Sequence, residues 1–124
     1  MVVDECTEAD ADRLFHALAD TTRRDILRRC LGEQPSVSRL ADGYPMSFAA
    51  VQKHVAVLER AGLVTKERRG REQLVRTELE AIGKARQALD HLEMEWRARV
   101  DRMTALLSEP EDGQANESTK GTPR

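Results

Sequence analysis

The sequence predicts a mainly α-helical domain that carries one β-hairpin. Apolar residues recur every three or four positions in four segments between residues 8 and 61, which is typical of amphipathic helices. The period changes to two between residues 63 and 77, which favours two short strands. Helical spacing resumes at Leu79 and continues to about Leu107. The expected order is α-α-α-α-β-β-α, in a 124-residue chain long enough for one modest core.

Two helices are expected at the start of this domain. The first covers Glu8–Ala19, and the second begins after Asp20, whose carboxylate can accept hydrogen bonds from the free N–H groups of the first turn. Gly32 is expected to stop the second helix, because glycine tolerates the left-handed conformation at a helix end. Leu14, Phe15 and Leu18 supply the apolar stripe of the first helix, and Ile26, Leu27 and Leu31 are expected to face inward in the second.

A short helix over Ser36–Asp42, with Ser36 as its expected cap, is followed by a Gly43-Tyr44-Pro45 turn and a longer helix. Ser47 is expected to cap the longer helix and Gly62 to end it. This arrangement is the layout of a helix-turn-helix, and the hairpin that follows, with Arg69-Gly70 at its turn, adds a basic wing. The residues expected inside are Val37, Leu40 and Ala41 in the short helix and Val51, Val55 and Leu58 in the longer one.

In a helix-turn-helix the second helix enters the major groove of DNA with its N-terminus first, and its early outward residues meet base edges. Gln can bond adenine, Lys can reach guanine or phosphate, and apolar groups can touch a thymine methyl. Arginines at a wing tip suit the minor groove or the backbone. The expected DNA-binding residues are Ser47, Phe48, Ala49, Gln52, Lys53 and His54 in the helix and Arg68, Arg69 and Arg71 in the wing.

Charge along the chain supports this interpretation. The net charge of the whole chain is −2, but residues 21–76 hold twelve Lys and Arg against six Asp and Glu, a net charge of +6. Taken alone, an outward polar face is typical of any surface helix, and a basic hairpin tip is usually just solvated. The order of turn, capped helix and arginine-tipped hairpin favours DNA binding over that interpretation.

Four segments of the sequence resemble a known family. The segments HALADTTRRDILRRC, VSRLAD, MSFAAVQKHVAVLERAGLV and RRGREQLVRT are similar to the ArsR/SmtB winged-helix bacterial repressors, over roughly residues 10–107. The resemblance implies a homodimer in which the first and last helices pair across a two-fold axis. It also implies binding to imperfect inverted repeats in promoter DNA, usually with repression of nearby genes.

The long last helix has the apolar stripe that such a dimer needs. Packing on the chain's own core is the alternative, but the stripe is longer than one small domain can cover. The residues expected at the dimer interface are Leu14, Phe15 and Leu18 in the first helix and Leu89, Leu92, Trp96, Val100 and Met103 in the last.

The sequence departs from the metal-sensing members of the family. SVSRLAD lacks the cysteine pair of one class. The other class requires a second histidine on the last helix, and none follows Asp90-His91. We therefore expect no metal site and no cofactor. Phe48 and Gln52 also differ from the residues frequent at their positions, so no operator preference can be transferred.

Other functions and the chain ends complete the expectations. No phosphate loop or nucleophile with a matched base appears, so no catalytic residues are expected. Two alternatives remain: a thiol switch through Cys6 or Cys30, and a winged helix that binds proteins instead of DNA. The inducing signal is left open: a small molecule, a redox change or none. With no apolar run of membrane length and no secretory signal, a cytoplasmic protein is expected, with a flexible N-terminus (1–7), a domain (8–107) and a disordered tail (108–124).

Overall fold

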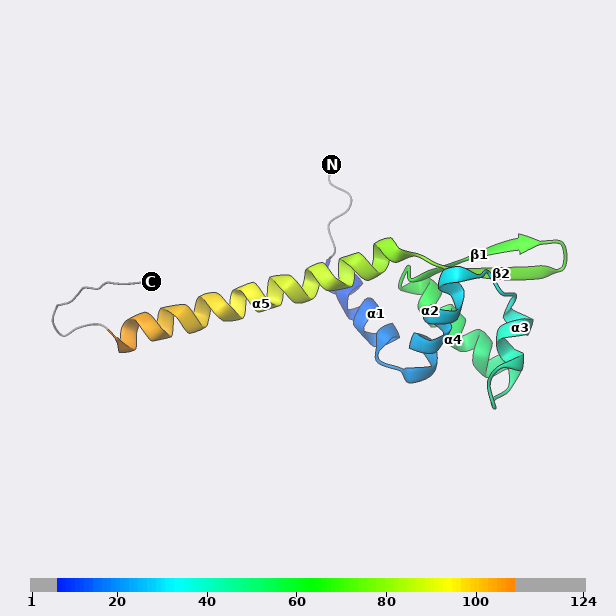
Figure 1. Cartoon of the computed structure of the whole chain (residues 1–124), viewed down its shortest axis with the longest axis horizontal. Coiled ribbons are helices and arrows are strands. Elements are labelled where there is room, and N and C mark those ends of the chain that lie inside the picture. The colour runs from blue at the N-terminus through cyan, green and yellow to red at the C-terminus, as the bar shows by residue number, and fades with distance from the viewer. Residues whose placement is uncertain (1–6, 109–124) are drawn as a thin grey trace. The chain divides into compact units, whose positions relative to one another are not determined.

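The computed structural model describes residues 7–108 and confirms the predicted fold class (Figure 1). The predictions for residues 1–6 and 109–124, which include the flexible N-terminus and the tail, lie outside the described residues. The chain divides into two compact units, with the boundary between Ala88 and Leu89. The elements are α1 (Glu8–Leu18), α2 (Thr21–Gly32), α3 (Val37–Asp42), α4 (Phe48–Arg60), β1 (Val64–Arg69), β2 (Glu72–Thr77) and α5 (Leu79–Leu107).

Side-chain caps begin the first four helices. The hydroxyl of Thr7 accepts from the Asp10 backbone N–H at 3.0 Å, and the Asp10 carboxylate accepts from the Thr7 backbone N–H at 3.2 Å. This backbone bond from Thr7 is the main reason that the pKa of Asp10 is lowered. Asp20, Ser36 and Ser47 each accept from a backbone N–H three residues later, which confirms all three predicted caps.

The end of α2 differs from the prediction. Gly32 is the last helical residue of α2, and the described glycines with positive φ are Gly62 (78°) and Gly70 (63°). The residue that caps the end of the helix is Glu33, where the backbone becomes extended. Leu31 is 52% exposed, so its predicted inward orientation is wrong. It follows Ile26 by five residues, about 140° around the helix, whereas Cys30 completes the buried face one turn after Ile26.

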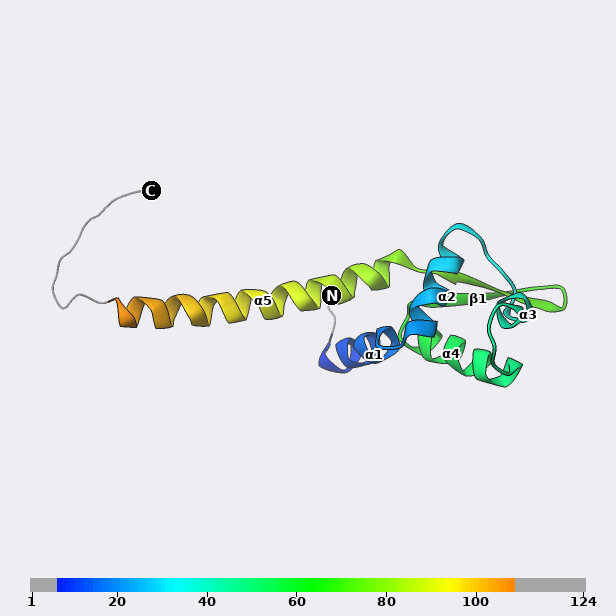
Figure 2. The same ribbon diagram turned by 60° about the horizontal axis from the view of Figure 1, so that its bottom comes forward.

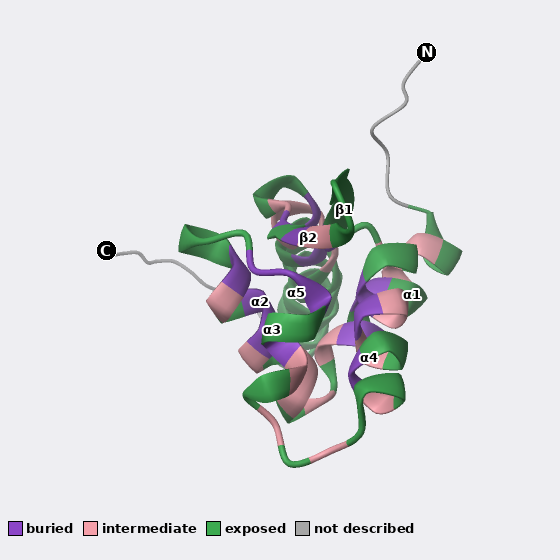
Figure 3. Ribbon diagram, turned by 90° about the vertical axis from the view of Figure 1, so that its right-hand side faces the viewer, coloured by how far each residue is buried: buried purple, intermediate pink, exposed green. Residues whose placement is uncertain are grey.

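The core gathers one apolar face from each of α2, α3 and α4, which turn toward one another (Figure 3). Ile26 and Leu27 of α2 are buried as predicted, as are Val37 and Leu40 of α3, while Ala41 is half-buried. The three predicted inward residues of α4, which are Val51, Val55 and Leu58, are all 2% exposed or less.

The hairpin is joined to the helices at its base. β1 and β2 pair antiparallel from Val64↔Thr77 to Arg69↔Glu72, with Gly70 in the turn as predicted. The buried Thr77 hydroxyl donates to the Leu27 carbonyl at 2.9 Å, which ties β2 to α2. A bridge between Ser36 and Leu74 places β2 beside the start of α3 (Figure 2). The wing therefore has a fixed base and an exposed tip.

Two glycines offer a matched test of these helix ends. Gly62→Ala should lower the free energy of unfolding by about 1 kcal/mol, because an alanine at φ 78° is strained although no atom lies within 4 Å of its Cβ. Gly32→Ala should leave stability unchanged or raise it slightly, because Gly32 is helical and equally uncrowded. Urea unfolding of the two variants measures the difference, and equal destabilisation of both would contradict this account of the helix ends.

Candidate nucleic-acid interface

The N-terminal turn of α4 presents a short polar face to solvent. Ser47 caps the helix through its bond from the Ala50 N–H at 3.0 Å, and the buried side of α4 fixes which residues point outward. Phe48 is 46% exposed, and the side chains of Gln52 and Lys53 are exposed without a hydrogen bond or ion pair inside residues 7–108. These groups are available to a ligand at no cost in internal bonds.

His54 has a different placement from its neighbours on this face. The ring is half-buried, and its Nδ1 lies 3.2 Å from the Arg23 Nη1 and 3.9 Å from the Asp20 carboxylate. The ring therefore contacts the N-terminal turn of α2, and the structure does not bring it together with Gln52 and Lys53 as a reading group.

The wing tip carries the three predicted arginines, all exposed. Arg69 makes a 3.3 Å ion pair with Glu67 on the same strand, and the Arg68 Nε donates to the Gly70 carbonyl at 3.3 Å. Exposed pairs of this kind contribute little to stability. The guanidinium groups can therefore exchange these partners for phosphate oxygens.

The residues predicted for a dimer interface fall into two groups. Leu14 is 3% exposed and Leu18 is half-buried, so both contribute to the chain's own core, whereas Phe15 is 36% exposed. On α5 the predicted residues are exposed: Leu89 (54%), Leu92 (62%), Trp96 (63%), Val100 (38%) and Met103 (56%). An apolar stripe of this length is unusual on a solvated helix.

Comparisons relate the chain to known proteins. Residues 18–67 match the family described as a helix-turn-helix domain. The uncharacterized HTH-type transcriptional regulator YuzN of Bacillus subtilis (strain 168) is 43% identical over 68 residues, which cover 48% of this chain and 73% of YuzN. An ArsR-like transcriptional regulator from Rhodococcus sp. RHA1, whose structure is solved, is 31% identical with a TM-score of 0.74; the match covers 81% of this chain and 92% of the Rhodococcus chain.

The chain belongs to the ArsR family. It is a transcriptional regulator with a helix-turn-helix DNA-binding domain, as the sequence predicts. A third protein shares the fold at 24% identity and a TM-score of 0.55: Mb0332 of Mycobacterium bovis, described as a homodimeric winged helix-turn-helix DNA-binding domain. The match covers 73% of this chain and 82% of the Mb0332 chain.

No cluster of three His, Cys, Asp or Glu side chains that could hold a metal ion occurs within residues 7–108. None of the described helices is long and apolar enough to cross a membrane.

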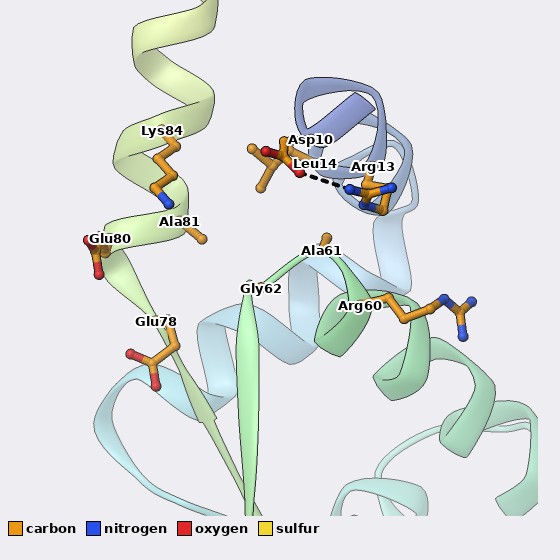
Figure 4. A pocket seen from close by; sticks show the side chains of 10 residues that line it. All are labelled: Asp10, Arg13, Leu14, Arg60, Ala61, Gly62, Glu78, Glu80, Ala81 and Lys84. Atoms are coloured by element: carbon orange, nitrogen blue, oxygen red, sulfur yellow. Dashed lines mark hydrogen bonds and ion pairs between the residues drawn. The ribbon is translucent and has the colours of Figure 1, made fainter. Parts of the chain in front are cut away.

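A hollow of about 380 Å³ lies between α1, the end of α4 and the start of α5 (Figure 4). Arg13 and Asp10 on its wall pair at 2.8 Å. Glu78 accepts from the Thr65 hydroxyl at 2.8 Å and from Arg76, and these bonds lower the pKa of Glu78. Arg60 points away from the hollow in Figure 4. Because its charges are of both signs, the hollow favours no single ligand chemistry.

The structure contains side chains whose roles the sequence analysis missed. Arg23 donates to the carbonyls of Ala17 (2.8 Å) and His16 (3.0 Å) at the end of α1. The Tyr44 hydroxyl donates to the Asp25 carboxylate at 2.6 Å. No local pattern signals these bonds, because their partners lie six to nineteen residues away along the chain.

Cys30 should be an unreactive thiol. It is fully buried, and burial raises its pKa to about 11, so almost no thiolate exists at pH 8. In a Cys6→Ser variant, where Cys30 is the remaining cysteine, a disulfide reagent at pH 8 should label it slowly in the native protein and at once in urea. Fast labelling of the native protein would instead restore the thiol-switch alternative.

Proposed function

We propose that this protein is a homodimeric repressor that binds an inverted-repeat operator through the N-terminal turn of α4 and the wing. One observation carries the proposal: the exposed side chains of Gln52 and Lys53, which have no hydrogen bond or ion pair within residues 7–108, lie on a capped helix that is followed directly by an arginine-tipped hairpin. The net charge of +6 over residues 21–76 supplies the field that attracts a polyanion.

The two parts of this surface have different roles in the proposal. Gln52 and Lys53, with Ser47, Phe48 and Ala49 beside them, would meet base edges in the major groove, where amide and ammonium groups discriminate between bases. The wing arginines would hold phosphates or the minor groove, which adds affinity for any sequence. His54 contacts α2 and is left out of the reading set.

Dimerisation through α5 accounts for its apolar stripe. At about 100° per residue, Leu89, Trp96 and Val100 lie within a narrow arc of the helix, and Leu92 and Met103 extend this arc on one side. A second copy would cover this stripe, with Phe15 of α1 contributing. The homodimeric Mb0332 supports such an assembly, and a two-fold dimer would match an inverted repeat. Residues 8–107 would then form one DNA-binding and dimerisation domain.

Repression itself follows from occupancy of a promoter. A reporter gene whose promoter contains the bound sequence should be expressed less when the protein is present. Higher expression would identify an activator, and unchanged expression would favour a winged helix that serves protein assembly.

Substitutions should separate affinity from base preference. Arg69→Ala with Arg71→Ala should weaken binding to every duplex and lower the salt dependence, by about 0.9 in the log–log slope for each phosphate that the protein no longer neutralises. Gln52→Ala should change which bases are enriched from a random-sequence pool, with a loss of about 1–3 kcal/mol of discrimination at one position. If Gln52→Ala enriched the same sequences as the wild type, α4 would not be the reading helix.

A second pair of variants tests the dimer. Trp96→Ala should shift the protein from dimer to monomer in analytical ultracentrifugation, because it removes the largest side chain of the stripe. Met94→Ala is the control: Met94 is 66% exposed, but it lies about 160° from Trp96 around the helix. Dimers of unchanged strength in Trp96→Ala would rule out this interface.

A further inference from the structure

The turn between α3 and α4 is held against α2 by polar contacts. Tyr44, the middle residue of the Gly43-Tyr44-Pro45 turn, is half-buried and donates its hydroxyl to the Asp25 Oδ2 at 2.6 Å. The Arg29 guanidinium carbon lies 5.3 Å from the centre of the Tyr44 ring, within the range of a cation–π contact. Asp25 and Arg29 are one turn apart on α2, so one helix face holds both ends of the tyrosine.

Gly43 makes room for this arrangement. A Cβ at this position would lie 2.6 Å from the Arg29 Nη1, closer than any real contact. The same Arg29 nitrogen donates a long hydrogen bond of 3.5 Å to the Leu40 carbonyl at the end of α3. The guanidinium therefore lies against both the ring of Tyr44 and the C-terminus of α3, where the helix dipole favours a cation.

The tyrosine hydroxyl is a dependable donor at this site. Burial, and then the Asp25 acceptor, raise the pKa of Tyr44, so the hydroxyl keeps its proton at neutral pH. A hydrogen bond to a carboxylate is shorter and stronger than one between neutral groups, and it is directional. The inward face of α4, by contrast, packs through Val51, Val55 and Leu58, whose apolar contacts have no preferred direction.

We propose that Tyr44, Asp25 and Arg29 form a positioning cluster that fixes the N-terminal turn of α4 and thereby sets base discrimination without any contact to a base. The inference rests on the proposed function of α4 as the reading helix. Tyr44 is four residues before Phe48, the first residue of α4, so movement of the turn displaces the reading residues directly. A displacement of about 1 Å is enough to break a bidentate base contact, whereas phosphate attraction tolerates it.

Tyr44→Phe tests the proposal, because it removes the hydroxyl and keeps the ring. The matched control is Thr77→Val, which removes another hydroxyl bond to α2, at 2.9 Å, but at the base of the wing. Two duplexes of equal length serve as probes: one enriched from a random pool by the wild-type protein, and its scrambled sequence. Tyr44→Phe should lower the ratio of the two affinities at least fivefold, while Thr77→Val should leave it within twofold.

Two further measurements show whether the effect is one of position. Asp25→Asn keeps an acceptor and should retain most of the ratio, whereas Asp25→Ala should lose as much as Tyr44→Phe, with no further loss in the double variant. Amide hydrogen exchange of residues 48–52 should become faster in Tyr44→Phe and not in Thr77→Val, a readout that needs no DNA.

The outcomes distinguish this inference from the function on which it rests. If Tyr44→Phe weakens binding to both duplexes equally, or leaves both unchanged, the positioning role is wrong while α4 still reads DNA. If the wild-type protein enriches no sequence from the pool, the proposed function itself fails and the cluster's role fails with it. Faster amide exchange in the variant together with a lower affinity ratio would support the positioning role.

Discussion

The arrangement of α1, α2 and α4 depends on one guanidinium group, that of Arg23. It donates to the carbonyls of His16 and Ala17 at the C-terminus of α1, where His16 also accepts from the Ala19 backbone N–H, and it lies 3.2 Å from the His54 ring on α4. Asp20, which accepts from the Arg23 backbone N–H, also begins α2 at this point. A planar group with five donors can make these bonds at once, and a lysine could not reach the same set. Arg23 therefore joins α1 to α4 through α2.

α2 extends this role along its length, because each of its faces holds a different element. Ile26 and Cys30 enter the core, and the Leu27 carbonyl receives the Thr77 hydroxyl from β2. Asp25 and Arg29 hold the turn before α4. α2 thus contacts α4 near its own N-terminus, and along its middle it holds both the turn before α4 and the base of the wing. These polar contacts add to the apolar core in locating α4.

The sequence predicts the elements well because the signals for them are local. Asp20, Ser36 and Ser47 signal helix starts within three residues, and Gly62 and Gly70 are the glycines with positive φ within residues 7–108. Leu31 was misplaced because five residues turn it about 140° around the helix from Ile26, and Gly32 is itself helical because the extended backbone begins one residue later, at Glu33. The contact of His54 with Arg23 spans 31 residues, so periodicity along one helix does not reveal it. The pairing of Tyr44 with Asp25 was missed for the same reason, because the two residues are 19 positions apart in the sequence.

In the proposed mode of DNA binding, affinity and specificity have separate physical sources. The wing arginines are exposed, and the contacts of Arg68 and Arg69 lie within their own hairpin. Dissolved salt therefore screens the attraction between these arginines and phosphate directly. The bond between Tyr44 and Asp25 is short, partly buried and internal, so salt screens it much less. Under the proposed function, substitutions at the hairpin tip would change how tightly the regulator holds DNA without moving α4. By the same proposal, a change on α2, away from the bases, would alter which sequence is preferred while the wing keeps its contacts with the DNA backbone.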